Sequence, residues 1–318
     1  MAKLYTHHVS TVALVLLALL MILAVVAVTL RRRAPPDPTE PATEVLDAAG
    51  ESIDGVRPVE GSTIERGPPL PVVLVHGLFG FDTVGVPGVK VHYFRGIVDH
   101  LGKLGCHAHA VRLPRAASVP ERAQILVDKI NALGHDRIDI IAHSLGGLDA
   151  RYAIAKLGLA SRVRALVTIG TPHRGSPIAD LATEGPLALA RKAVAALGVP
   201  LVAVDWLSTE ALERFNQDVV DVPGVRYACV VGGIREPSTP VALAIAPAHA
   251  YLRRVSGPND GVVPMTSQYW GETLAEIEAD HFEQVGWRMG MRQTFDAHAM
   301  YAFIVARLGD APAVRPPA

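Results

Sequence analysis

The stretch Ile138–Gly147, which reads IDIIAHSLGG, constrains the fold more than any other part of the chain. Apolar residues that favour a strand run into Ser144, two glycines follow, and a helical pattern begins at Leu148. A strand, a sharp turn and a helix in this order predict a nucleophile elbow, which holds a serine hydroxyl above the edge of a sheet. The residues that face each other across such a turn must be small, and here they are Ala142 and Gly146. The alternative interpretation is a serine that caps an ordinary helix.

Strand and helix patterns alternate along the chain from residue 71 onward. Apolar runs predict strands at 71–75, 107–113, 137–142, 163–169, 225–231 and 273–279, and periodic patterns predict helices at 94–105, 120–133, 148–157 and 294–308. Because parallel strands need crossover connections, this alternation predicts an α/β fold. We expect a mostly parallel sheet of about six strands with helices on both faces.

The N-terminal segment predicts a membrane anchor. Residues 12–28 form an unbroken apolar run, and no charged residue lies between Lys3 and Arg31. About 20 apolar residues are enough to cross a bilayer as a helix. We therefore predict one transmembrane helix at about 9–30 within an anchor segment 1–33. A long cleaved signal peptide is the alternative.

Two further ranges complete the predicted domain organisation. Residues 34–69 are rich in proline and in acidic residues, which predicts a solvated, extended linker. Residues 70–318 would then form one globular domain. The formal net charge of −1 gives no indication of a nucleic-acid partner. The two cysteines, Cys106 and Cys229, cannot form a disulfide framework and match no metal-binding motif.

A second motif follows the first predicted strand, in the sequence His76-Gly77-Leu78-Phe79-Gly80. A hydrolase with a nucleophile elbow needs two backbone N–H groups that point at the oxyanion formed during acyl transfer. One comes from the residue after the nucleophile and the other from the loop after an early strand, which predicts Leu145 and Leu78. The glycines would let a substrate carbonyl approach bare backbone. A strand–helix turn that binds no ligand is the alternative.

The general base should lie late in the chain, because the order in hydrolases with this elbow is serine, acid, histidine. His281 directly follows the last predicted strand, where a loop at the carboxyl edge of the sheet belongs. His249 and His298 are the other late candidates. His298 falls inside the last predicted helix, and His249 falls in a stretch rich in alanine and proline.

The acid that orients the histidine should also lie on a loop. Asp260 stands among the turn-forming residues of Ser256–Pro264, where its carboxylate could orient the imidazole and stabilise its charged form. An ordinary turn is the alternative interpretation of this segment. Asp205 and Asp280 are the other candidate acids.

Taken together, these motifs resemble the triacylglycerol lipase group of bacteria, which are α/β hydrolases and include secreted enzymes that depend on a foldase. The matching segments, in this order, are Val73–Asp82, His143–Gly147, Gly170–Ser176, Asn259–Gly261 and His281–Val285. The resemblance extends from about residue 71 to the C-terminus. It implies the α/β-hydrolase fold, with Ser144 as nucleophile, His281 as base, Asp260 as acid, and the N–H groups of Leu78 and Leu145 as oxyanion donors.

Such lipases often hold a structural calcium ion, partly through a carboxylate two residues after the catalytic histidine. Glu283 keeps this carboxylate, but Trp287 stands where a glutamine is expected, and residues 237–259 contain no upstream carboxylate. Calcium prefers several oxygen ligands. We therefore predict no metal site, and we predict no cofactor.

Residues 178–207 stand where a lid would lie. A helix is predicted at 186–197, between Pro186 and Gly198, in a stretch with few charged residues. Such a helix could cover the serine and open onto lipid. A packed helix of the fold is the alternative.

The sequence thus predicts a serine ester hydrolase of the cell membrane, first of all a triacylglycerol lipase, whose partners are the membrane and a lipid or other ester. The alternatives are a short-chain carboxylesterase, a phospholipase or an acyltransferase with the same triad, or a catalytically silent binding module on a membrane anchor. Arg31, Arg32 and Arg33 favour a cytoplasmic catalytic domain. The resemblance to secreted lipases favours export instead, and the need for a foldase is left open.

Overall fold

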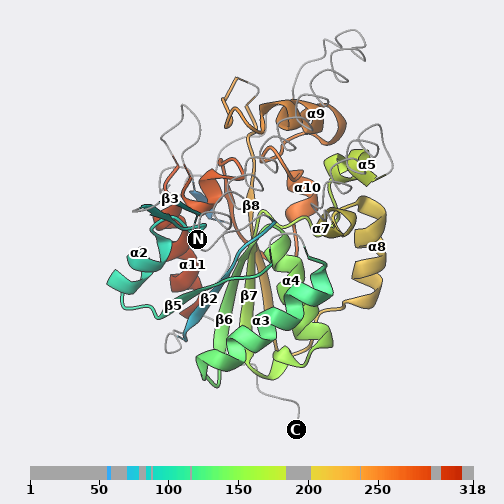
Figure 1. Ribbon diagram of the computed structural model, residues 1–318. Helices are drawn as coiled ribbons and strands as arrows, with labels where there is room; N and C mark the ends of the chain where they lie inside the picture. Colours follow the sequence, from blue (N-terminus) through green and yellow to red (C-terminus); the bar gives the residue numbers. More distant parts are fainter. Residues whose placement is uncertain are drawn as a thin grey trace, which may run out of the picture.

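The computed structural model describes residues 56–58, 70–78, 84–86, 89–114, 117–183, 202–236, 238–287 and 295–309. A seven-stranded sheet runs through this part of the chain in the order β5-β2-β6-β7-β8-β9-β1 (Figure 1). Its strands are β1 (Val56–Pro58), β2 (Val72–Val75), β5 (Ala108–Val111), β6 (Ile138–His143), β7 (Val163–Ile169), β8 (Arg226–Gly232) and β9 (Glu272–Ile277). Six of them are parallel, and β1 pairs with β9 in the antiparallel sense. The predicted mostly parallel sheet is confirmed. A separate two-stranded ribbon joins β3 (Val84–Val86) to β4 (Val89–Val91).

The strand order places two functional loops side by side. β2, the first of the parallel strands along the chain, lies between β5 and β6, and Val75 stands opposite Ala142 in the β2–β6 register. The chain therefore leaves β2 and β6 at neighbouring points of the same edge. Crevices at such edges, where the strand order changes direction, are where open α/β sheets bind ligands.

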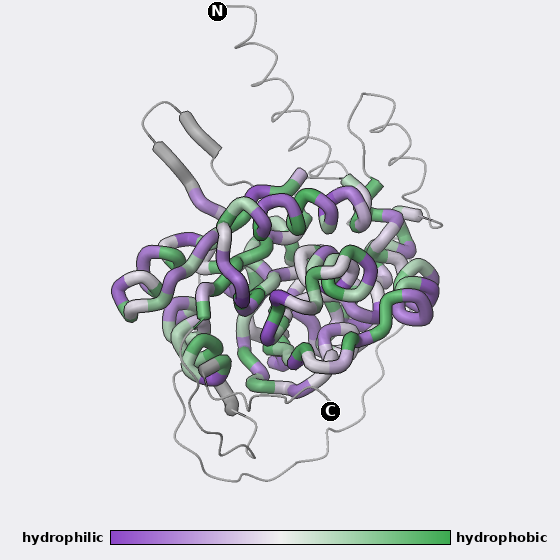
Figure 2. Tube along the Cα trace, turned by 90° about the horizontal axis from the view of Figure 1, so that it is seen from below, coloured by the Kyte–Doolittle hydropathy of each residue, from purple (hydrophilic) through white to green (hydrophobic). Residues whose placement is uncertain are grey.

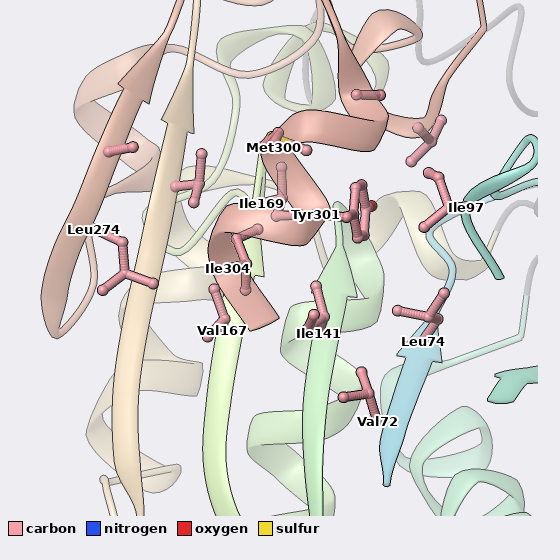
Figure 3. Close-up of a cluster of buried hydrophobic side chains, with 14 of the residues drawn as sticks. Val72, Leu74, Ile97, Ile141, Val167, Ile169, Leu274, Met300, Tyr301 and Ile304 are labelled. Carbon is pink, nitrogen blue, oxygen red and sulfur yellow. The ribbon is translucent and has the colours of Figure 1, made fainter. Parts of the chain in front are cut away.

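Helices cover both faces of the sheet. Val72 and Leu74 of β2 belong to the buried cluster that includes α2 (Ile97–Lys103) and α11 (Ala297–Gly309), and Figure 3 shows side chains of that cluster between α11 and the strands. Val73 and Val75 point to the opposite face, which is packed with residues of α3 (Val119–Leu133) and α4 (Leu145–Lys156). Because both faces are buried, β2 is apolar at all four positions.

The other helices within the described ranges are mostly short. They are η1 (Leu159–Ser161), α5 (Pro177–Thr183), α7 (Val202–Asp205), α8 (Thr209–Asp218), α9 (Ala246–Ser256), α10 (Met265–Gln268) and η2 (Glu283–Val285). In Figure 1, α5 and α9 lie beyond the upper ends of the strands. In Figure 2, hydrophilic and hydrophobic residues alternate along the helices, as expected of helices that bury one face.

The helix after the elbow starts earlier than predicted. The helix after the elbow begins at Leu145 rather than Leu148, so Gly146 and Gly147 lie inside α4. Glycine is a poor helix former, but a Cβ atom at position 146 would lie 2.6 Å from the backbone oxygen of Val75. Residue 146 is therefore a glycine because α4 packs closely on the end of β2, although glycine lowers helix propensity.

The predicted linker contains part of the sheet. Within 34–69, residues 56–58 form β1 and pair with residues 275–277 of β9, and most of the rest of this range lies outside the described residues. The predicted transmembrane helix at 9–30 and the predicted helix at 186–197 also lie outside them. None of the helices that the structure describes is long and apolar enough to cross a membrane.

Candidate active site

Ser144 occupies a strained turn between β6 and α4. Its backbone has φ 57° and ψ −132°, and it is the only described residue other than glycine with a positive φ. Strain of this kind persists only where the surroundings impose it, and it is frequent at active sites. The Ser144 side chain makes no capping hydrogen bond to α4, and the residue is 7% exposed. A helix-capping serine does not account for this conformation, whereas a nucleophile elbow does.

Glycine at position 77 allows the loop after β2 to lie directly against Ser144. A Cβ atom at this position would lie 2.6 Å from the Cβ atom of Ser144, 3.0 Å from its Oγ and 3.1 Å from the hydroxyl of Tyr93. Real Cβ atoms do not approach that closely, so any side chain here would displace the serine or the loop. The two predicted motifs therefore meet in space.

His76 fixes the orientation of the peptide between Gly77 and Leu78. The backbone N–H of Leu113 donates to His76 Nε2 at 2.9 Å, so the ring proton sits on Nδ1 and donates to the carbonyl of Gly77 at 2.8 Å. The carbonyl of residue 77 and the N–H of residue 78 share one planar peptide and point in opposite directions. The N–H of Leu78 therefore faces away from the His76 ring, as an oxyanion donor should.

A buried ion pair contacts the loop that follows β2. Arg122 and Asp149, both fully buried, are 2.8 Å apart, and Arg122 also donates to the carbonyl of His76 at 2.8 Å and to that of Gly77 at 3.5 Å. Burial raises the pKa of Asp149 to about 6, although the guanidinium opposes this shift. Loss of either partner would leave a buried charge uncompensated beneath the loop.

His281 and Asp260 form an acid–base pair at the ends of distant segments. His281 Nδ1 lies 2.7 Å from Asp260 Oδ2, and the second carboxylate oxygen accepts the backbone N–H groups of Val262 at 2.9 Å and Val263 at 2.7 Å. Asp260 is fully buried and His281 is 9% exposed. With its Nδ1 proton donated to the carboxylate, the neutral imidazole presents a lone pair at Nε2, which is what a general base requires.

The other candidate residues have different surroundings. His298 is on α11 beside Asp296 and packs on His100, whereas His249 lies on α9 with its Nε2 atom buried and unpartnered. The carboxylate of Asp280 accepts the backbone N–H groups of residues 242, 282 and 283, and Asp205 lies in α7. Among the described candidates, the structure therefore brings together His281 and Asp260.

Three residues around the site were not predicted from the sequence to be functional: Tyr93, Arg122 and Gln284. Gln284 lies within the His281–Val285 motif, which predicted roles only for His281 and Glu283. It is fully buried between His143 and Asp260, at 3.1 Å from each. Burial, and secondarily the charge of His281, lowers the pKa of His143 well below its usual value, so this ring stays neutral.

The surroundings of Glu283 differ from those of a calcium ligand. Glu283 accepts the backbone N–H of Asp280 at 2.9 Å, and the indole N–H of Trp287 donates to the carbonyl of Tyr93 at 2.9 Å. Trp287 thus packs into the protein where the resemblance leads one to expect an amide ligand. Over the described ranges, no group of three or more His, Cys, Asp or Glu side chains could hold a metal ion.

We expect chelation to leave both thermal stability and ester hydrolysis unchanged. A resident calcium ion would stabilise the native state by mass action, so its removal would lower the melting temperature. The measurement is a melting curve after treatment with a chelator, with calcium and then magnesium added back. A rise in melting temperature that is specific to calcium would contradict this expectation.

Comparison with known proteins indicates a class of enzyme. Residues 119–189 match a family described as "Putative serine esterase (DUF676)". The chain is 27% identical to a triacylglycerol lipase of Vibrio cholerae, over 71% of this chain and 82% of that protein. It is 28% identical to a triacylglycerol lipase of Pseudomonas fragi, over 76% of this chain and 96% of that one. The crystal structure of the mature Bacillus licheniformis lipase BlEst2 superposes with a TM-score of 0.58 at 22% identity, covering 78% of this chain and 96% of that one.

The chain is a serine ester hydrolase with the α/β-hydrolase fold. The resemblance to the triacylglycerol lipase group that the motifs indicated is confirmed. The hydrolase brings a strained serine, a glycine loop and a histidine–carboxylate pair to one region at the carboxyl edge of the sheet. This set of groups can carry out acyl transfer.

Proposed function

We propose that this ester hydrolase is a lipase that cleaves triacylglycerols through an acyl-enzyme on Ser144. The observation that carries the proposal is the strained Ser144 backbone, with Gly77 against its side chain. A hydroxyl held in this way reacts only if a base and an oxyanion site accompany it. The His281–Asp260 pair supports the first requirement, and the Leu78 and Leu145 N–H groups support the second.

The proposed acylation forms one C–O bond, breaks another, and passes one proton from Ser144 through His281 to the leaving alcohol. Ser144 Oγ attacks the ester carbonyl carbon while His281 Nε2 takes the hydroxyl proton. The carbonyl oxygen becomes an oxyanion, which the N–H groups of Leu78 and Leu145 stabilise. The intermediate then collapses: the ester C–O bond breaks, the leaving alcohol takes the proton from His281, and Asp260 stabilises the imidazolium that exists in between.

Deacylation repeats these steps with water as the nucleophile. His281 removes a proton from water, and the hydroxide formed attacks the acyl carbon. Collapse releases the fatty acid and returns the proton to Ser144 Oγ. An acceptor alcohol in place of water would give acyl transfer between lipids. An acyltransferase would therefore use every residue named here.

The choice of a lipid substrate rests on the relatives and on two exposed apolar residues. The relatives from Vibrio cholerae and Pseudomonas fragi are named triacylglycerol lipases. Val202 on α7 is 45% exposed and Leu243, just before α9, is 85% exposed, and α5 contacts both helices. Exposed apolar side chains on neighbouring elements favour contact with a lipid surface.

Activity on esters of increasing acyl length tests the choice of substrate. Soluble p-nitrophenyl esters and emulsified triacylglycerols should be compared at equal enzyme concentration, with Ser144→Ala as the blank. A lipase hydrolyses emulsified long-chain triacylglycerols and gains activity when the substrate passes its solubility limit. Activity confined to soluble short-chain esters would replace the proposal by a carboxylesterase, and release of fatty acid from phospholipids alone would replace it by a phospholipase.

We further propose that residues 9–30 anchor the hydrolase in the cell membrane as a single span. The support is the apolar run and its length. Arg31, Arg32 and Arg33 favour a cytoplasmic catalytic domain. Protease treatment of spheroplasts, with and without permeabilisation, decides the side. Recovery of the full-length protein in the soluble fraction, or a mature N-terminus after residue 33, would contradict the anchor.

A further inference from the structure

Gln284 fills a slot that two glycines leave open. A Cβ atom at Gly170, at the end of β7, would lie 2.2 Å from Gln284 Oε1, and one at Gly232, at the end of β8, would lie 2.3 Å from Gln284 Nε2. The carboxamide therefore fits between two neighbouring strand ends that carry no side chain. A buried amide in such a slot needs partners for both its oxygen and its nitrogen.

The charge of Asp260 fixes the direction of every proton around this amide. An ionised carboxylate only accepts hydrogen bonds, so Gln284 Nε2 donates to Asp260 Oδ2 at 3.1 Å and Oε1 faces His143. His143 must then carry its proton on Nε2, which lies 3.1 Å from Gln284 Oε1. Its Nδ1 atom is left as an acceptor. The lowered pKa of His143 supports this neutral tautomer.

The chain of hydrogen bonds continues to the loop over Ser144. His143 Nδ1 lies 2.7 Å from the hydroxyl of Tyr93, so Tyr93 donates to it. The Tyr93 oxygen accepts the backbone N–H of Gly77 at 3.3 Å. Each donor thus points toward Asp260 along one path: Gly77 N–H, Tyr93 O–H, His143 Nε2–H and Gln284 Nε2–H. Aligned hydrogen bonds of this kind strengthen one another.

We propose that Gln284, His143 and Tyr93 are positioning residues that couple the acid–base pair to the oxyanion loop. Gln284 holds the Asp260 carboxylate that orients His281, and through His143 and Tyr93 the same amide holds the N–H of Gly77. Both halves of the site are thereby fixed by one relay, which rests on the proposed function of Ser144 and His281. His143 also packs on His281 itself, with ring centroids 4.5 Å apart.

The test is a double-mutant cycle with Gln284→Met and Tyr93→Phe. Tyr93 has no hydrogen bond to Gln284, so two independent structural roles would give additive losses. We expect Gln284→Met to lower kcat about tenfold to a hundredfold with little change in KM, as for the loss of one hydrogen bond to a charged group. Tyr93→Phe should cost about tenfold alone but less than about twofold in the Gln284→Met protein, because the relay is already broken there.

Gln268→Met provides the matched control. Gln268 Nε2 also lies near Asp260 Oδ2, at 3.4 Å, but its other hydrogen bonds go to the backbone of Gly232 and Val263 rather than to His143. The loss of kcat in Gln268→Met and the loss of kcat in Tyr93→Phe should therefore be additive in the double variant. Equal, additive losses in both cycles would overturn the relay. Melting curves establish that each variant is folded. If Gln284→Met is unfolded, Gln284→Glu replaces it.

Gln284→Glu gives a second readout, the pH dependence of kcat, which would not change if Gln284 had a purely structural role. A protonated carboxyl has one O–H donor and one carbonyl acceptor, which can replace the two hydrogen bonds that the amide makes to Asp260 and His143, so it rebuilds the relay. The ionised form has no donor and repels Asp260. The neighbouring carboxylate raises the pKa of the new side chain. The ratio of mutant to wild-type kcat should therefore fall as pH rises. The titratable groups that surround the position are Asp260, His143 and His281, with Asp280 and Glu283 on its own segment.

The outcomes separate this inference from the proposed function. A ratio that does not vary with pH would overturn the relay while wild-type hydrolysis through Ser144 still stands. Absence of hydrolysis that depends on Ser144 in the wild-type protein would overturn the proposed function instead. Coupling between Tyr93 and Gln284, together with the falling ratio, supports the relay.

Discussion

Ser144→Ala and His281→Ala will each remove nearly all ester hydrolysis from a protein that still folds. We expect kcat to fall by about 10⁴-fold or more in either variant, because serine and histidine act as one unit in acyl transfer. The double variant should be little worse than either single one for the same reason. The measurement is the rate of p-nitrophenyl ester hydrolysis, with melting curves to establish that each variant is folded.

Asp260→Asn extends the same series. The amide cannot stabilise the imidazolium of His281, so its loss should equal that of His281→Ala or be somewhat smaller. His298→Ala is the matched control, because this histidine lies on α11 beside Asp296 and is 42% exposed at its side chain. Near-normal turnover in a folded His281→Ala protein would contradict the assignment.

Gly77→Ala will have the second largest effect. The new Cβ atom would stand 2.6 Å from the Cβ of Ser144 and 3.0 Å from its Oγ, so either the serine or the oxyanion loop must move. Displacement of the loop removes an oxyanion donor, and we expect a loss of about 10²–10³-fold in kcat. KM should change less, because the groups that the methyl group displaces act mainly on the transition state.

Gly102→Ala is the control for a methyl group added to glycine. Gly102 lies in α2, and a Cβ atom there meets nothing within 4 Å. Alanine is the better helix former, so this variant should retain activity and gain a little stability. Full activity in Gly77→Ala would show that the loop does not take part in the reaction as described.

The sequence predicted the sheet and the placement of the main site residues because each rests on a local pattern. A strand in the middle of a parallel sheet is mostly apolar: β2 is apolar at all four positions, and β6 is buried throughout, with Asp139 and His143 as its two polar residues. A turn before a helix selects small residues beside Ser144. Since parallel strands end at one edge, residues that follow β2 and β6 could be expected to meet. Their actual contact, at Gly77 and Ser144, depends on β2 and β6 being neighbours.

The start of α4 could not be predicted from propensity. Two consecutive glycines favour an irregular segment, yet both lie in the helix because the space beside them is already filled. Val75 and His76 carbonyl oxygens approach Gly146, and the Thr171 side chain approaches Gly147. Such close approaches come from segments far away in the sequence, so no local pattern records them.

The hydrogen-bond relay around Gln284 could not be predicted from the sequence for a similar reason. A glutamine in a short turn is usually solvated, and nothing nearby in the sequence signals that it is buried. The slot is made by Gly170 and Gly232, which lie at the ends of two other strands. β1 was missed because Val56–Pro58 is too short to show a pattern, and its pairing with β9 is a long-range contact.

A covalent label on the nucleophile tests the central claim most directly. The protein should be treated with a fluorophosphonate, digested and mapped by mass spectrometry, with the Ser144→Ala protein treated in parallel. We predict a single adduct on the peptide that contains Ser144, formed at the same rate as ester hydrolysis is lost, and none in Ser144→Ala. An adduct on a different serine, or full loss of hydrolysis with Ser144 unmodified, would contradict the account.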